Sequence, residues 1–249
     1  MKLNLDEKDI LGIKKGIYDN SFETATIKAN LKKGDVFLDL GANLGYYTLL
    51  GSKLVGENGR VYAFECDEEP YKLLKQNVED NSLKNVQVIK KAVFGSNGTK
   101  RLYQREDNTA GSTLFRVGRR ARDVLKKRKY IDVETIRLDD SFLKRIKVDF
   151  IKMDIEGSEY SALRGMEEII RSNPNIKIVL EFYPELIDGV EGIVCSKEML
   201  IFLERIGFSL CLINEKRKCL EMKEIEEIME ECKINRYVNL YCFKGWKDD

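Results

Sequence analysis

Short apolar runs alternate with amphipathic segments along the chain after residue 34. The apolar runs show no polar alternation, which is typical of strands buried on both faces of a sheet. The segments between them have helical spacing, as in 68–81, where Leu73, Leu74 and Val78 share one side. We expect strands at 36–40, 60–64, 86–93, 131–137, 148–153, 176–182, 208–213 and 237–243, a hairpin or loop at 100–115, and helices at 44–54, 68–81, 158–171, 197–206 and near 221–231.

This alternation predicts an α/β, Rossmann-like fold with a parallel sheet, right-handed crossovers and helices on both faces. We expect residues 1–34 to form a helical lead-in and residues 35–249 to form one domain, with a basic insertion at about 116–130. Sheets of this kind bind ligands beyond the carboxyl ends of their strands. Four acids lie at or near such ends: Asp39, Glu65, Asp154 and Glu181.

The amino-acid composition excludes several classes of function. The chain has no histidine, which excludes Ser-His-Asp hydrolysis and histidine-ligated zinc. Its 43 basic and 42 acidic residues nearly cancel, so no overall field favours a nucleic acid or a membrane. No apolar run approaches the roughly 18 residues of a spanning helix, and the first ten residues do not resemble a signal peptide. The six cysteines are scattered without a C-x-x-C pair, so we predict a reduced, cytoplasmic protein.

The stretch V-F-L-D-L-G-A-N-L-G-Y-Y runs from a strand directly into a glycine loop. Gly41 and Gly45 supply backbone angles that a side chain would obstruct, and Asn43 tolerates a left-handed conformation. The bare backbone would let a ligand lie against the loop. The spacing differs from the dinucleotide fingerprint G-x-G-x-x-G, and Asp39 beside the loop would repel a phosphate. The loop therefore favours a cationic ligand.

The end of the next strand adds a second signal. Glu65 follows Gly45 by twenty residues, at a position where an acid accepts hydrogen bonds from ribose hydroxyls. These positions favour a ligand with a ribose, a positive charge and no phosphate. S-adenosylmethionine has these features, because it carries an adenosine, an ammonium and a sulfonium. The alternative is that Asp39 only caps the turn and Glu65 only caps the following helix.

At these residues the sequence resembles the FkbM-type group of class I S-adenosylmethionine-dependent methyltransferases. The resemblance covers roughly residues 34–183 and implies a seven-stranded sheet whose last strand is reversed. Cys66 stands where the family usually has proline, and the basic stretch is longer than is common. Four segments carry the resemblance in order: G-A-N-L-G-Y-Y-T (41–48), Y-A-F-E-C-D-E-E-P-Y (62–71), V-E-T-I-R-L-D-D-S-F (133–142) and D-F-I-K-M-D-I-E-G-S-E-Y-S-A-L-R-G (149–165).

The resemblance also implies which residues bind the cofactor. The methionine part would be held by the first motif, the ribose by the acid of the second segment, and the adenine by residues after the third strand. In this chain these positions are Asp39, Gly41, Asn43 and Gly45 for the methionine part, Glu65 for the ribose, Asp67 near the adenosine, and, toward the end of the predicted third strand, Lys91 and Ala92 near the adenine edge.

The stretch K-M-D-I-E-G-S-E supplies the candidate catalytic groups. If the strand continues, Lys152, Asp154 and Glu156 share one face beside the expected sulfonium, and Ser158 can cap the next helix. A carboxylate there can orient and deprotonate a hydroxyl, and two close carboxylates raise one pKa toward a useful base. One alternative is an ion-pair network that only holds the turn. Another is a Mg²⁺ site formed by Asp154, Glu156 and Glu181, although we predict no metal.

The acceptor is less constrained. Residues 116–130 contain eight cations and one acid, so they form either a solvated segment or a clamp for an anionic acceptor. The chain has neither [ND]-P-P-[YFW] nor P-C-Q, which leaves oxygen as the favoured acceptor atom. We predict methylation of a hydroxyl on a sugar, metabolite or lipid-linked acceptor. The alternatives are an RNA ribose methyltransferase, a non-catalytic S-adenosylmethionine-binding module and, more distantly, a dinucleotide-dependent oxidoreductase.

Overall fold

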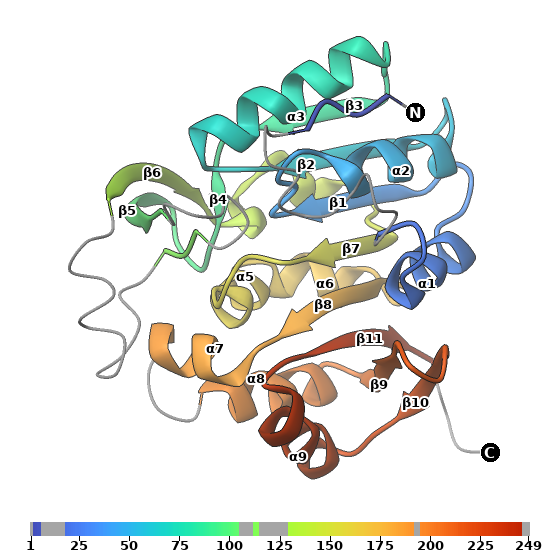
Figure 1. The fold of residues 1–249 in the computed structure, drawn as a ribbon, viewed down its shortest axis with the longest axis vertical. Coiled ribbons are helices and arrows are strands. Elements are labelled where there is room, and N and C mark those ends of the chain that lie inside the picture. The colour runs from blue at the N-terminus through green and yellow to red at the C-terminus, as the bar shows by residue number, and fades with distance from the viewer. Residues whose placement is uncertain (1, 6–17, 105–111, 115–128, 192–194, 246–249) are drawn as a thin grey trace.

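The computed structural model describes residues 2–5, 18–104, 112–114, 129–191 and 195–245. Within these residues the chain forms a large mixed sheet, a smaller sheet beside it, and helices on both faces of the large sheet (Figure 1). This is the α/β, Rossmann-like arrangement that the alternating pattern predicted.

The main sheet has the strand order β10-β9-β11-β8-β7-β1-β2-β3. Strand β11 is antiparallel to both of its neighbours, which confirms the reversed last strand. An eighth strand, β10, extends the expected seven at the edge beside β9. The predicted helix near 221–231 is wrong at its start, because Glu221 and Met222 lie on β10. The strands are β1 (Val36–Leu40), β2 (Arg60–Phe64), β3 (Val86–Ile89), β7 (Phe150–Met153), β8 (Lys177–Phe182), β9 (Phe208–Asn214), β10 (Cys219–Met222) and β11 (Val238–Lys244).

Side chains of the central strands alternate between two buried layers. On β1, Leu38 and Leu40 belong to the larger core cluster and Phe37 belongs to the second. On β7, Ile151 belongs to the larger cluster and Phe150 belongs to the second. Apolar runs without polar alternation therefore mark strands that are covered on both faces, as predicted.

The helices divide between the two faces. Core residues of α1 and α2 pack in the second cluster, whereas those of α5, α6, α8 and α9 pack in the larger one. The predicted helix at 158–171 is two helices, which meet at Gly165 and Met166. Among the described residues, none of the helices is sufficiently long and apolar to cross a membrane. The helices are α1 (Phe22–Asn30), α2 (Tyr46–Val55), α3 (Glu68–Asp80), α5 (Glu159–Gly165), α6 (Glu167–Ser172), α7 (Pro184–Glu191), which was not predicted, α8 (Cys195–Arg205) and α9 (Ile225–Asn235).

The smaller sheet arises where the predicted third strand divides. After Ile89 the chain leaves the main sheet, and β4 (Ala92–Val93) pairs in parallel with β6 (Tyr130–Ile136). Strand β5 (Gly98–Tyr103) pairs antiparallel with β6. Of the basic stretch 116–130, only the last two residues lie within the described part of the chain.

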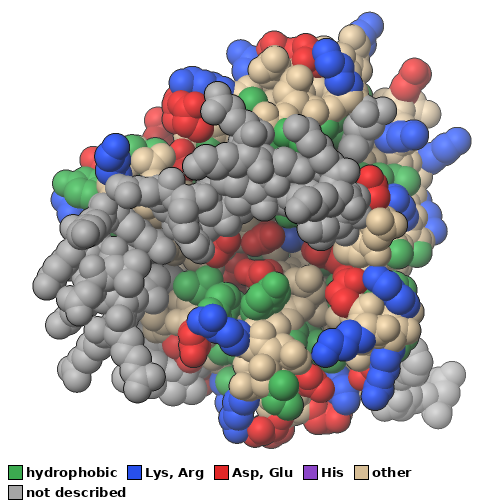
Figure 2. All heavy atoms as spheres, in the orientation of Figure 1, with side chains coloured by type: hydrophobic (Ala, Val, Ile, Leu, Met, Phe, Trp, Pro, Cys, Tyr) green, Lys and Arg blue, Asp and Glu red, His purple; other side chains and the backbone are tan. Residues whose placement is uncertain are grey.

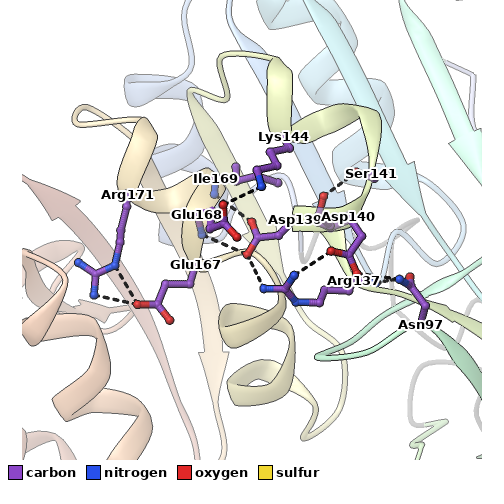
Figure 3. Close-up of polar contacts among 11 residues, drawn as sticks. Asn97, Arg137, Asp139, Asp140, Ser141, Lys144, Glu167, Glu168, Ile169 and Arg171 are labelled. Carbon is purple, nitrogen blue, oxygen red and sulfur yellow. Dashed lines mark hydrogen bonds and ion pairs between the residues drawn. The ribbon is translucent and has the colours of Figure 1, made fainter.

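A buried acid explains the break between α5 and α6. Asp139 is 2% exposed and lies in a 3₁₀ helix (Leu138–Asp140) that precedes a second one (Phe142–Arg145). Its two carboxylate oxygens accept hydrogen bonds from the backbone N–H groups of Glu168 (3.1 Å) and Ile169 (3.0 Å), at the start of α6 (Figure 3). Arg137 donates to the same carboxylate at 3.1 Å and to Asp140 at 2.8 Å. The R-L-D-D part of the third segment therefore has a structural role.

We expect Asp139→Ala to lower the free energy of unfolding by about 3 kcal/mol, because it leaves two helix N–H groups without their acceptor and removes the buried partner of Arg137. Chemical denaturation checks this. The matched control is Asp140→Ala, which removes the exposed partner of the same arginine and is expected to cost under about 1 kcal/mol. Equal losses in the two variants would contradict the capping role.

Candidate active site

The glycine loop lies between the ends of β1 and β7. Gly41 has φ +79°, and a Cβ there would lie 1.9 Å from the carbonyl oxygen of Asp154. Gly45 has φ +94° at the start of α2, and a Cβ there would lie 2.6 Å from Leu74 Cδ1. Asn43 is left-handed, with φ 49°. The left-handed turn was predicted correctly, but these glycines make room for neighbouring protein atoms as well as for a ligand.

A cavity opens between this loop, the end of β2 and the smaller sheet. We call it the β2 cavity. Its lining contains both apolar residues and polar residues, among them acids at the strand ends. Its apolar lining includes Phe64, Ala92, Val93, Leu102, Ile155 and Leu114, and its polar lining includes Asn43, Glu65, Asp67, Lys91, Ser112, Asp154, Glu156 and Ser158.

Glu65 is held rigidly at the wall of the β2 cavity. One carboxylate oxygen accepts a hydrogen bond from the backbone N–H of Asn43 at 2.9 Å, and the other accepts one from the N–H of Asp67 at 2.8 Å. Burial raises the pKa of Glu65 to about 7 although these two bonds oppose the shift. Each oxygen keeps a second lone pair for a ligand.

Asp67 and Lys91 line the cavity but have protein partners. The buried carboxylate of Asp67 accepts hydrogen bonds from Gln104 Nε2 at 2.8 Å and from Ser112 Oγ at 3.1 Å. Lys91 pairs with Glu134 at 2.9 Å. Asp67 therefore fixes the wall formed by residues after β5.

A second cavity is lined by other residues of the same loop. We call it the tyrosine cavity. It shares Gly41, Asn43 and Asp154 with the β2 cavity, so these residues lie between the two cavities. The rest of its lining is Tyr18, Asp39, Ala42, Leu44, Tyr46, Tyr47 and Lys152.

Asp39 and Lys152 are the buried charges of the tyrosine cavity. Asp39 is 1% exposed and accepts a hydrogen bond from Thr48 Oγ1 at 2.5 Å. Burial raises the pKa of Asp39 to about 6, against the opposing effects of Thr48 and Lys152. Lys152 is 3% exposed and pairs with Glu23 at 3.3 Å and with Asp154 at 3.4 Å. Burial opposes its charge, but the carboxylates of Asp154 and Glu23 raise the pKa of Lys152 well above its usual value.

The turn after β7 differs from the prediction. The strand ends at Met153, and Glu156 adopts φ 52°, so Glu156 does not continue the face of Lys152 and Asp154. Glu156 lines the β2 cavity, Lys152 lines the tyrosine cavity, and Asp154 lines both. Ser158 occupies the N-cap position of α5, but its buried hydroxyl makes no cap bond and has no hydrogen-bond partner among the described residues.

Further acids surround this turn. Glu159 is buried, accepts a hydrogen bond from the N–H of Ile155 at 3.0 Å, and has its pKa raised by burial to about 7. Burial and the charges of Asp154, Glu156 and Glu159 raise the pKa of Glu181 to about 9. Figure 2 shows acidic side chains gathered in a hollow near the middle of the face of the molecule that it draws. Within the described ranges no three His, Cys, Asp or Glu side chains are placed to hold a metal, so the alternative Mg²⁺ site at Asp154, Glu156 and Glu181 is not formed.

Known proteins agree with this arrangement. The family model for the methyltransferase FkbM domain matches residues 39–233. A probable cobalt-precorrin-6B C(15)-methyltransferase (decarboxylating) of Sulfolobus acidocaldarius is 43% identical over 65 residues, 26% of this chain and 34% of that protein. Methyltransferase sdnD of Sordaria araneosa is 26% identical over 165 residues, 56% of this chain and 63% of that protein. The matches thus span a third to somewhat under two thirds of these relatives.

Among solved structures, the fold is similar to that of methyltransferase FkbM from Methylobacillus flagellatus. The TM-score is 0.50 at 18% sequence identity, over 84% of this chain and 43% of that chain. The sheet, with its reversed last strand, is that of a class I S-adenosylmethionine-dependent methyltransferase. Because the family model covers most of the sequence, the chain belongs to the methyltransferase FkbM family, and S-adenosylmethionine is its cofactor.

The residues present fit this cofactor. Asn43 Oδ1 and Ser158 Oγ are buried polar atoms that have no hydrogen-bond partner in the described part of the chain, and both residues line the β2 cavity. Glu65 retains acceptor capacity for ribose hydroxyls. Sequence reasoning found the acids and glycines but missed Leu102, Ser112 and Leu114, because tertiary structure brings them in from around the second sheet.

The raised pKa values predict an unusual pH dependence of stability. Asp39, Glu65 and Glu159 bind protons more tightly in the folded chain than in the unfolded chain. Their contribution to stability is therefore complete below their unfolded pKa values and is lost as the pH rises through about 6 to 7. No histidine titrates in this range. We expect a higher thermal midpoint at about pH 5.5 than at about pH 8 for the cofactor-free protein, and a smaller difference in Glu65→Gln. A midpoint that rises toward pH 8 would contradict this.

Proposed function

We propose that this chain transfers a methyl group from S-adenosylmethionine to a hydroxyl oxygen of a sugar, metabolite or lipid-linked acceptor. The observation that carries the proposal is the position of Asp154, which lines both cavities. Glu156 lines the β2 cavity together with it. Carboxylates at that junction are suited to orient a hydroxyl and to accept its proton.

The two cavities suggest how the cofactor is held. In the β2 cavity, Phe64, Leu102 and Leu114 would enclose the adenine, with Lys91 and Ala92 at its edge. The carboxylate of Glu65 would accept both ribose hydroxyls. The methionine part would extend past Gly41 and Asn43 into the tyrosine cavity.

Charge supports this direction for the methionine part. The tyrosine cavity holds the buried carboxylate of Asp39 and the buried ammonium of Lys152, and Asp154 borders it. The α-ammonium of an amino acid favours the carboxylates, and its carboxylate favours Lys152. Asp154 and Glu23 keep Lys152 charged, so Lys152 serves as a positioning cation and the base is a carboxylate.

The chemistry at the junction follows from alignment and proton acceptance. Bound S-adenosylmethionine supplies a methyl group on an already activated sulfonium. The protein must hold the acceptor in line at about 3 to 3.5 Å, and Asp154 or Glu156 removes the hydroxyl proton as the new bond forms. Cys66 is the only cysteine lining the β2 cavity in the described part of the chain, and burial with nearby Glu65 raises its thiol pKa, so a cysteine nucleophile is not supported.

The domain limits, the cellular location and the RNA alternative also belong to this proposal. We assign residues 35–249 to the methyltransferase domain and 1–34 to its lead-in. A cytoplasmic location is supported by six cysteines that are all free of disulfides. The RNA alternative depended on 116–130, and residues 116–128 lie outside the described part of the chain.

Transfer of a ¹³C-methyl group from labelled S-adenosylmethionine to a panel of hydroxylated acceptors tests the proposal. The panel pairs neutral glycosides with their phosphate esters and includes a short RNA. Carbon shifts of the product distinguish O-methyl from N-methyl and C-methyl groups. An O-methyl product that depends on Asp154 or Glu156 is expected, and a methyl group on nitrogen or carbon would contradict it.

A further inference from the structure

Residues 112–114 contact both the side of the active site proposed to hold the cofactor and the turn after β7 that carries the proposed base. We propose that Ser112 and Thr113 are positioning residues, one for the cofactor and the other for the catalytic turn, so that one short segment aligns both. This inference rests on the proposed function, because it takes Glu156 as part of the methyl-transfer machinery.

The cofactor side of the contact runs through Asp67. Ser112 Oγ donates to one carboxylate oxygen of Asp67 at 3.1 Å, and Gln104 Nε2 donates to the other at 2.8 Å. The N–H of Asp67 in turn donates to Glu65 at 2.8 Å. Ser112 is therefore linked by two hydrogen bonds to the proposed ribose acceptor, and the next residue but one, Leu114, forms part of the apolar wall.

The catalytic side runs through Thr113. Thr113 is 2% exposed, and its Oγ1 donates to the carbonyl oxygen of Glu156 at 2.8 Å. Backbone bonds of 2.8 and 3.2 Å between Tyr103 and Thr113 fasten this segment to β5. The hydroxyl of Thr113 thus connects the smaller sheet to the turn after β7.

The turn needs such support because of its conformation. Glu156 has φ 52° and Gly157 has φ 97°, so two successive residues are left-handed. A left-handed residue other than glycine costs about 1 to 3 kcal/mol and persists only where its surroundings hold it. The bond from Thr113 fixes the peptide that carries Glu156, and a displacement of about 1 Å at a reacting group can lower a rate on the order of 100-fold.

The substitutions separate the two roles. Thr113→Val keeps the shape and removes the hydroxyl, and we expect turnover to fall at least about tenfold with the S-adenosylhomocysteine dissociation constant changed less than about twofold. Thr113→Ser keeps the hydroxyl and is expected to restore most of the turnover. Ser112→Ala is expected to weaken S-adenosylhomocysteine binding about threefold or more, with kcat at saturating cofactor nearly unchanged.

One readout needs no acceptor. Hydrogen–deuterium exchange of a peptide that covers residues 154–158, with S-adenosylhomocysteine bound, is expected to be faster in Thr113→Val than in the parent and in Thr113→Ser. Three results would overturn the inference. Exchange in Thr113→Val could equal that of the parent, Thr113→Ser could lose as much turnover as Thr113→Val, or Thr113→Val could lose as much cofactor affinity as it loses turnover. If exchange and binding behave as expected but no hydroxyl is methylated, the proposed function fails while the positioning contact stands.

Discussion

Glu65→Ala is expected to lower the affinity for S-adenosylhomocysteine at least tenfold. The variant removes the acceptor for two ribose hydroxyls, and hydrogen bonds to a charged group contribute about 1.5 to 3 kcal/mol each. It also removes the carboxylate that fixes the N–H groups of Asn43 and Asp67. Isothermal titration calorimetry measures the change directly and needs no acceptor.

The matched control for this variant is Glu68→Ala. Glu68 lies three residues further on, is partly exposed, pairs with Lys90 and Lys72, and lines neither of the two cavities. Its removal should leave the calorimetric affinity unchanged. Parent-like affinity in Glu65→Ala, or an equal loss in Glu68→Ala, would show that the acid at the end of β2 does not hold the ribose.

Glu156→Gln is expected to abolish most of the turnover, by about 100-fold or more, while S-adenosylhomocysteine binds with nearly its normal affinity. Glutamine keeps the size of the side chain and its capacity to accept a hydrogen bond but cannot take up the proton. If Asp154 is the base, the same separation of turnover from binding is expected in Asp154→Asn. Initial rates with an acceptor from the panel measure it.

The control for these two variants is Glu185→Gln, because Glu185 is an exposed acid on α7. Its turnover should equal that of the parent chain. If Glu156→Gln and Asp154→Asn both turn over like the parent, neither carboxylate is the base, and the proposed proton transfer is wrong.

The sequence predicted the strands that hold the site because their signal is local. The limits of β1 and β2 match the predicted ranges, since each is a short, mainly apolar run followed by a glycine loop or an acid. The short strand β10 was missed because its residues alternate between partly buried and exposed. Helix α7 was missed although Pro184 at its first position and Glu185 in its first turn are helix-start signals. The third strand was predicted as one because nothing in 86–93 marks the change of sheet.

The residues of the candidate site were likewise predictable from the sequence only where their signal is local. Acids at strand ends can be read from the sequence, because the ends of parallel strands meet at one edge. The left-handed conformation of Glu156 could not be predicted, since glutamate seldom adopts it and tertiary contacts impose it here. Ser112, Thr113 and Leu114 reach the site only through the pairing of the smaller sheet and the Tyr103–Thr113 bridge, and no sequence pattern indicates that contact.

A crystal structure with S-adenosylhomocysteine tests the central claim most directly. We predict that the adenine lies between Phe64, Leu102 and Leu114, that both ribose hydroxyls contact Glu65, and that the sulfur lies beside Asp154 where the two cavities meet. A ribose placed away from Glu65, a dinucleotide phosphate on the loop at 41–45, or empty cavities at saturating S-adenosylhomocysteine would contradict it.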